Sequence, residues 1–152
     1  MIIETLKELY DRDLKKLRTE IESYRDETAM WKVSGEIPNS AGNLALHLVG
    51  NLKHFIGAVL GNSGYVRERD LEFSNKNIPR TELLKMIDES ADVVAATFDK
   101  LTHEQLEQVY PIVVFADRTT PMTTGWFLIH LATHLNYHLG QINYHRRLFD
   151  VK

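Results

Sequence analysis

Four of the seven histidines stand at helical spacing within residues 130–145. No other feature of the sequence restricts the fold of the chain as much as this row of histidines. An α-helix turns about 100° per residue, which places His130 and His138 about 40° to either side of His134. Gln141 and His145 return to within about 20° of His134 by the same geometry. Apolar side chains flank the row, namely Phe127, Leu131 and Ile142. We therefore expect one long helix that carries imidazoles on its apolar side.

Imidazoles on an apolar helix face need partners, because burying a polar group without one is costly. A metal ion suits a cluster of neutral imidazoles, and His134 and His138 have the four-residue spacing at which one ion can be chelated. His47, central in a second expected helix, is our candidate for the third ligand. Three imidazoles suit zinc or nickel and leave a coordination position open, as in catalytic sites. The alternative is that these histidines are hydrogen-bonded core residues.

Other polar side chains are candidates for the lining of the same site. Asn51 lies one helical turn beyond His47, and Gln141 lies near the line of the ligand pair. Each either orients a bound ligand or satisfies a neighbouring imidazole N–H. Tyr137 either reaches the rim of the pocket or packs at a helix interface. The roles of the remaining histidines in these helices stay open, namely His54, His130 and His145.

The connector at residues 65–79 is rich in charge and has little periodicity. Its charged candidates are Arg67, Glu68, Arg69 and Asp70. They either cap the site and bind an anionic substrate, or pair with one another in solvent. In the first case, removal of Arg67 would weaken substrate binding without loss of metal.

Amphipathic periodicity predicts four long helices, at residues 3–24, 40–60, 80–101 and 120–149. Ser40 is expected to cap the second helix, and Thr102 a short helical turn. Thr120 and Pro121 are expected to open the last helix. Residues 109–115, apolar and β-branched, form either a short extended piece or a packed loop.

Long connectors follow the second and third helices, and no segment shows a convincing sheet pattern. We therefore expect an all-α chain, an antiparallel four-helix bundle that forms a single domain over residues 1–152. The spacing alone leaves the order of the helices open.

The composition excludes several classes of protein. Hydrophobic residues make up 43% and charged residues 26%, as in ordinary globular domains, and the net charge of −3 offers no basic field for nucleic acid. The absence of cysteine rules out disulfides, thiolate zinc sites and a cysteine nucleophile. The first residues lack the apolar core of a signal peptide, and no apolar run approaches the roughly 20 residues of a membrane span. We expect a cytoplasmic protein that binds neither nucleic acid nor membrane.

Two segments resemble the DinB/YfiT-like proteins, a broad group of metal-dependent enzymes with four-helix bundles. The resembling residues are Leu46-His47-Leu48 and His134-Leu-Asn-Tyr-His138-Leu-Gly-Gln141. Residues 64–73 also resemble a loop of one branch of that group. The resemblance implies that His47, His134 and His138 bind one divalent metal, that the protein is a homodimer, and that the long loop after the second helix crosses the bundle.

Members of that group include transferases that join a low-molecular-weight thiol to an electrophile, and a thiol-dependent isomerase. A metal held by three neutral histidines keeps its double positive charge, which lowers the pKa of a bound water or thiol. We therefore expect activation of a thiol or water nucleophile, as in a thiol transferase or a hydrolase. A thiol would arrive with a cosubstrate, since the chain has no cysteine. The alternative is a non-catalytic bundle stapled by its metal, which a fourth protein ligand such as His54 or His130 would favour.

Overall fold

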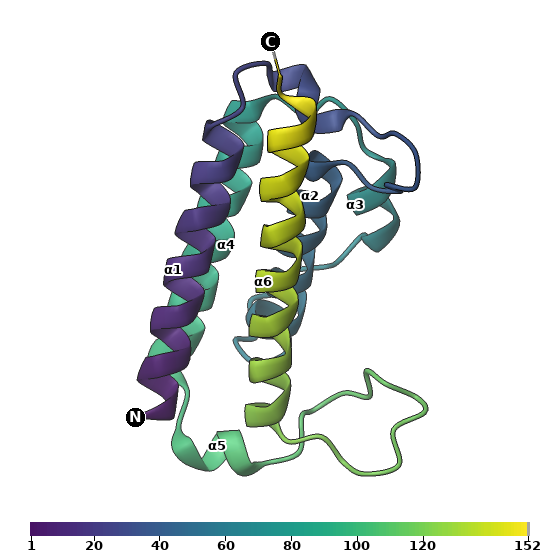
Figure 1. The fold of residues 1–152 in the computed structure, drawn as a ribbon. Coiled ribbons are helices and arrows are strands. Elements are labelled where there is room, and N and C mark those ends of the chain that lie inside the picture. The colour runs from purple at the N-terminus through teal and green to yellow at the C-terminus, as the bar shows by residue number, and fades with distance from the viewer. Residues whose placement is uncertain (152) are drawn as a thin grey trace.

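The computed structural model describes residues 1–151, and within them every regular element is helical. Four long helices lie side by side (Figure 1), namely α1 (Ile2–Glu22), α2 (Ala41–Leu52), α4 (Arg80–Lys100) and α6 (Thr124–Phe149). Four shorter elements connect or extend them, namely η1 (Glu27–Trp31), the π-helical η2 (Lys53–Ala58), α3 (Arg69–Ser74) and α5 (His103–Glu107). The predicted all-α class is confirmed.

Polar pairs between helices establish the direction in which each long helix runs. On α1 and α4, Lys7 pairs with Asp99 and Arg18 pairs with Asp88, so these two helices are antiparallel. The α1 and α6 helices are parallel, because residues 13 and 20 of α1 bond to residues 136 and 143 of α6. The α2 and α4 helices also run in the same direction (Figure 1).

The prediction of an antiparallel arrangement therefore holds for only part of the packing. The helices α1 and α2 each contact both α4 and α6. Each of them has one antiparallel and one parallel neighbour, because the connector at residues 59–79 returns the chain along the length of the molecule, whereas residues 101–123 stay at the end where α5 lies (Figure 1). The connector after α2 carries α3, which packs on the side of α2. This topology brings α2 and α6 together as antiparallel neighbours.

The apolar faces predicted from the periodicity meet in one core. The largest fully buried side chains come from all four long helices and their connectors, namely Tyr10, Tyr24, Phe127, Leu17, Ile21, Met30, Leu48, Leu52, Ile56, Leu83, Ile87 and Leu128. All twelve residues of α2 are buried, because α4, α6, α3 and η1 surround this helix. A helix that is apolar all round is expected in such a central position, and any polar group on it needs a partner.

Two predicted helix starts are confirmed and one is wrong. The side chains of Ser40 and Thr102 cap α2 and α5 as expected, the second in a capping box. The last helix begins after Thr123, whose side chain accepts a hydrogen bond from the backbone N–H of Trp126 at 3.2 Å, and not at Thr120. The reason is tertiary: residues 122–124 are held extended against residues 108–110 by backbone hydrogen bonds of 2.8 Å.

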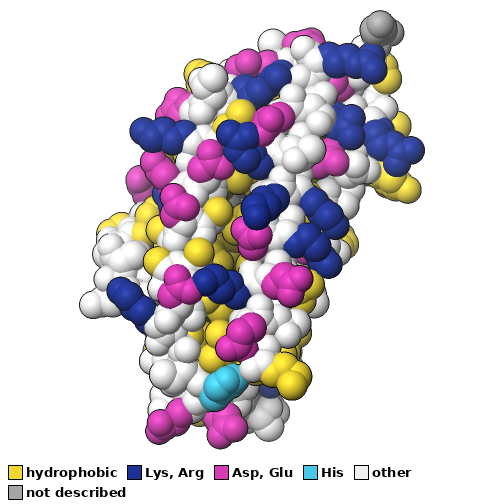
Figure 2. Space-filling model, turned by 90° about the vertical axis from the view of Figure 1, so that its left-hand side faces the viewer, with side chains coloured by type: hydrophobic (Ala, Val, Ile, Leu, Met, Phe, Trp, Pro, Cys, Tyr) yellow, Lys and Arg dark blue, Asp and Glu magenta, His cyan; other side chains and the backbone are white. Residues whose placement is uncertain are grey.

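Figure 2 shows the side of the molecule on which α1 lies, with cationic and anionic side chains interspersed. Ion pairs between α1 and α4 account for part of this pattern. Such a surface has no continuous basic field of the kind that binds nucleic acid. Within residues 1–151, none of the helices combines the length and the apolar character that a membrane span requires.

Candidate metal centre

The three predicted ligands come together where α2 passes α6. The Nε2 atom of His134 lies 3.2 Å from the Nε2 atom of His47 and 3.1 Å from that of His138. His47 is 8% exposed, and both α6 histidines are half-buried. One nitrogen atom from each ring lies within 4.8 Å of the others, so the group can hold a metal ion. The helical spacing of four residues, with a third histidine from a facing helix, produces this convergence.

Partners on the far side of two rings determine which nitrogen carries the proton. The Nδ1 atom of His47 donates to Oε1 of Glu72 at 3.0 Å, and the Nδ1 atom of His138 donates to Oε1 of Gln141 at 2.7 Å. A carboxylate and an amide oxygen only accept hydrogen bonds, which assigns the proton to Nδ1 in each neutral ring. The Nε2 lone pairs of both rings therefore point to the centre of the group.

A cation fits this arrangement better than hydrogen bonds within the group. Two inward lone pairs face the Nε2 atom of His134, and a neutral ring can donate a proton from that atom to only one of them. The buried Nδ1 atom of His134 has no partner in the part of the chain that the structure describes. A divalent ion that accepts all three lone pairs removes the conflict, and neutral imidazoles are the donors that zinc and nickel bind.

The electrostatics of the group keep the α6 imidazoles neutral. Burial, with smaller contributions in the same direction from the neighbouring His138 and His47, lowers the pKa of His134 to about 4. Burial also lowers the pKa of His138, against the opposing effect of its hydrogen bond to Gln141. Because a metal binds the neutral form of imidazole, both rings are ready for coordination near neutral pH.

The buried carboxylate of Glu72, on α3, is the main feature that the sequence did not reveal. Its side chain is paired with Arg67 through two hydrogen bonds of 2.8 Å, as well as with His47. Burial on its own would raise the pKa of the Glu72 carboxyl, but the hydrogen bonds from Arg67 and His47 outweigh it and lower that pKa. The carboxylate is therefore ionised and forms a buried Arg–Glu–His chain behind the metal ligand.

The connector prediction is corrected by this finding. Residues 69–74 form a short helix where a loop was expected, and Arg67 pairs within the connector in a half-buried position, not in solvent. The other three charged candidates, at positions 68–70, are exposed. The sequence does carry a signal of a close approach at Gly50, because a glycine inside an apolar helix costs about 1 kcal/mol, but that signal does not identify Glu72 as the residue that approaches.

The remaining candidate histidines lie outside the cluster. His145 is aligned with His134 on the helix but lies three turns away, between the Tyr24 hydroxyl at 2.7 Å and the Lys32 carbonyl at 2.8 Å. His130 stacks on Trp126 with ring centres 5.4 Å apart. His54, in η2, packs edge-on against its neighbour Phe55. Within residues 1–151, the metal-competent group has three members, and neither His54 nor His130 is a fourth.

The other pocket candidates have different outcomes. Gln141 satisfies the His138 N–H, one of its two predicted roles. Asn51 is 6% exposed, and its side-chain oxygen has no hydrogen-bond partner among the described residues. Tyr137 is 65% exposed with its ring edge-on to His138, so it does not pack between helices. Gly140, the residue before Gln141, has open space around the position of a Cβ atom, so no other part of the described chain packs closely against it.

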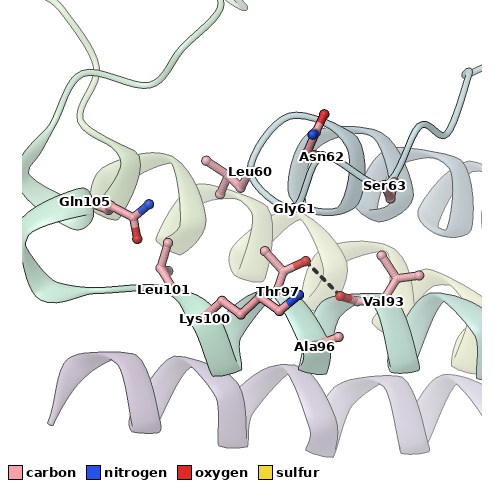
Figure 3. Close-up of a pocket in the computed structure, with 10 residues that line it drawn as sticks. All are labelled: Leu60, Gly61, Asn62, Ser63, Val93, Ala96, Thr97, Lys100, Leu101 and Gln105. Atoms are coloured by element: carbon pink, nitrogen blue, oxygen red, sulfur yellow. Dashed lines mark hydrogen bonds between the residues drawn. The ribbon is translucent and has the colours of Figure 1, made fainter.

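Two other cavities among the described residues are not lined by the three histidines. Figure 3 shows one of about 230 Å³ between the end of η2 and α4, where the Thr97 hydroxyl donates to the Val93 carbonyl. Lys100 is its one titratable lining residue. A groove of about 710 Å³ between α1 and α6 is lined in part by Tyr137 and Gln141. This groove therefore reaches Gln141, the side chain that is hydrogen-bonded to His138.

Comparison with known proteins gives one match. A family model described as "Protein of unknown function (DUF1572)" matches residues 2–151, nearly the whole chain. That family lies in the DinB-like clan, in agreement with the resemblance found in the two histidine segments. A search of curated proteins gave no match.

Proposed function

The chain belongs to the DUF1572 family of the DinB-like clan, and on this premise we propose that it is a metal-dependent enzyme. Its site takes one divalent ion, zinc or nickel, on the imidazoles of His47, His134 and His138. The observation that carries this proposal is the convergence of three Nε2 atoms, two of them with lone pairs directed inward by partners on the opposite ring nitrogen. We interpret the four long helices as a DinB-type bundle that holds this site between its second and last long helices.

When bound, a divalent ion in this site supplies Lewis acidity, which lowers the pKa of a water or thiol that reaches it. The residues of the chain hold the site ready for that chemistry. Three protein ligands leave at least one coordination position open, the pattern of catalytic zinc sites. Asn51 lies one turn from His47, and its buried side-chain oxygen has no partner among residues 1–151; we assign it to accept a hydrogen bond from the substrate or cosubstrate.

The nucleophile distinguishes the two reactions that this site can support. With a low-molecular-weight thiol as cosubstrate, the enzyme is a transferase that joins the thiol to an electrophile. With water as nucleophile, it is a hydrolase. The absence of cysteine means that the chain supplies no thiol of its own.

We also propose that the protein is a homodimer, as the resemblance implies. The outward side of α6 supports this, because large apolar residues stay exposed along its length, namely Trp126, Ile129, Tyr137, Tyr144 and Leu148. Gly140 lies between the two tyrosines, and no other part of the described chain lies within 4 Å of the position that a Cβ atom would take there. A second copy that approaches α6 there would account for both features. Light scattering on the purified protein tests this: a monomer mass at all concentrations would contradict it.

The proposed function is tested with the cobalt-loaded protein and two small thiols, cysteine and 2-mercaptoethanol. Thiol binding at the open position should add a sulfur-to-cobalt charge-transfer band. The loaded protein should also accelerate the substitution in which the thiol sulfur displaces chloride from 1-chloro-2,4-dinitrobenzene and the thiol proton is released. If water is the nucleophile, the loaded protein should instead increase the rate of hydrolysis of 4-nitrophenyl acetate. The His134→Ala variant is the control in each assay. A metal-loaded protein with no thiol band and no activity above this variant would contradict the enzyme and favour a metal-stapled, non-catalytic bundle.

A further inference from the structure

We propose that Glu72 is a positioning residue for the metal centre, holding the His47 ring in the tautomer and orientation that direct its Nε2 atom to the ion. This inference rests on the proposed function, because it concerns the same site. It assigns a purpose to the connector between α2 and α4: the short helix α3 delivers a carboxylate behind a metal ligand.

The contacts of Glu72 occupy both of its carboxylate oxygens. Oε1 accepts hydrogen bonds from His47 Nδ1 at 3.0 Å and from Arg67 Nη2 at 2.8 Å, and Oε2 accepts one from Arg67 Nε at 2.8 Å. The glutamate is 6% exposed. Arg67 thus fixes the carboxylate in a two-point pairing, which leaves one direction for the bond to the imidazole. A carboxylate on the far nitrogen of a metal-binding histidine orients the ring and makes it a stronger ligand.

Gly50 makes room for this carboxylate. A Cβ atom at Gly50 would lie 2.0 Å from Oε2 of Glu72 and 2.6 Å from its carboxyl carbon. Residue 50 follows His47 by three positions, so both lie on one face of α2. Because a glycine within a helix costs about 1 kcal/mol relative to alanine, its presence here serves the close approach of α3.

A second polar residue on the same face of α2 anchors the backbone of α3. The side-chain amide of Asn43 donates to the carbonyl of Glu72 at 2.9 Å and to the carbonyl of Asn75 at 2.8 Å. Asn43 precedes His47 by four residues. A helix of six residues is not stable alone, so these bonds and the packing on α2 hold it in place.

The phenyl ring of Phe73 restricts His47 from another direction, with the two ring centres 5.0 Å apart. The imidazole is therefore in contact with both Glu72 and its chain neighbour. An anchor for α3 alone would not need a buried charge, since apolar side chains of similar volume stabilise at least as well as a buried ion pair. The buried charge of Glu72 is explained by its effect on His47, whose ring it orients.

The test compares zinc affinity, by competition with a chromogenic chelator, and the visible spectrum of the cobalt-loaded protein across a set of variants. Glu72→Ala removes the acceptor, and Glu72→Gln keeps an acceptor but removes the charge. Gly50→Ala displaces the carboxylate while leaving it in the chain. Glu107→Gln, at an exposed glutamate of α5, is the matched control. Thermal unfolding of each metal-free variant reports structural damage separately.

We expect Glu72→Ala to weaken zinc binding about 10- to 100-fold and to shift the cobalt bands. Glu72→Gln should have a smaller effect, Gly50→Ala a loss in the same range, and the control none. If Glu72→Ala fails to fold, the zinc affinities and cobalt spectra of Glu72→Gln and Gly50→Ala decide the question instead. Lower thermal stability with wild-type zinc affinity and cobalt spectrum would reduce Glu72 to an anchor and overturn the inference. Failure of the wild-type protein to bind either zinc or nickel would instead overturn the proposed function.

Discussion

The Nε2 atom of His47 on α2 lies 3.2 Å from the Nε2 atom of His134 on α6, across 87 positions of the chain. An ion shared by these atoms ties two helices together and binds the folded state only, so it stabilises that state by mass action. Zinc at about 1,000 times its dissociation constant should add about 4 kcal/mol, which is roughly 10 °C in Tm for a chain of this size.

Differential scanning calorimetry of the metal-free protein, with and without zinc, measures this shift. The His138→Ala variant should lose most of it. An equal rise in Tm for the variant would show that zinc binds somewhere other than the three-histidine group.

Removal of the Gln141 side chain should weaken metal binding modestly. Its amide oxygen lies 2.7 Å from Nδ1 of His138, and a hydrogen bond of this kind contributes about 1 kcal/mol. Gln141→Ala should therefore reduce zinc affinity by roughly fivefold, as read by chelator competition. Gln108→Ala, at an exposed glutamine, should leave the affinity unchanged. Wild-type affinity in Gln141→Ala would show that the amide does not orient the ring.

The metal-free protein should lose stability as the pH falls from about 6.5 towards 4. Burial lowers the pKa of His134 to about 4 in the folded state, from 6.5 for an unperturbed imidazole. The unfolded chain therefore binds more protons in that window, and the free energy of unfolding decreases with decreasing pH. After allowance for the partial exposure of this ring, the contribution is about 1 to 2 kcal/mol.

Urea unfolding of the metal-free wild type and His134→Gln at pH 7 and pH 4.5 tests the assignment. The variant should show the smaller decrease between the two pH values, since its residue 134 does not titrate. Equal decreases would mean that other groups carry the acid sensitivity.

The N-cap of α6 offers a test of a point on which sequence and structure differ. Thr123→Ala removes the hydroxyl that accepts a hydrogen bond from the Trp126 N–H, which should cost about 1 kcal/mol of stability. Thr120→Ala, at the position that the sequence favoured, should stay within about 0.5 kcal/mol of wild type. Chemical denaturation of both variants gives the comparison. The reverse order would restore Thr120 as the cap.

The long helices and the metal-ligand candidates could be predicted because both depend on local repetition. Apolar residues at spacings of three and four define α1, α2, α4 and α6, and the same spacing places His134 and His138 on adjacent turns. His47 was the candidate for the third ligand because it lies inside another apolar helix. The directions of the helices could not be predicted in the same way, because they depend on the paths that the long connectors take along the molecule.

Helical angle alone also misled about distance. His145 lies within about 20° of His134 around the helix, but 11 residues at about 1.5 Å each place it roughly 16 Å along the axis. Its partners are the Tyr24 hydroxyl and the Lys32 carbonyl, which only the tertiary structure brings there. A shared face is therefore necessary for a common site but does not establish one.

Glu72 could not be predicted because no periodic pattern marks α3. Six residues form that helix only when Asn43 and the surface of α2 hold them, and the partner histidine lies 25 residues earlier in the chain. The N-cap position of Thr123 was missed for a similar reason, because backbone pairing with the preceding segment determines where α6 begins. Both are features that tertiary contacts decide.

Metal content is the measurement that tests the central claim most directly. Untagged protein, dialysed after exposure to zinc or nickel and analysed by mass spectrometry, should hold about one divalent ion per chain. His138→Ala should lose it, while His130→Ala should retain it, although both histidines lie four residues from His134 on α6. No bound metal in the wild type, or equal retention in both variants, would contradict the three-histidine centre.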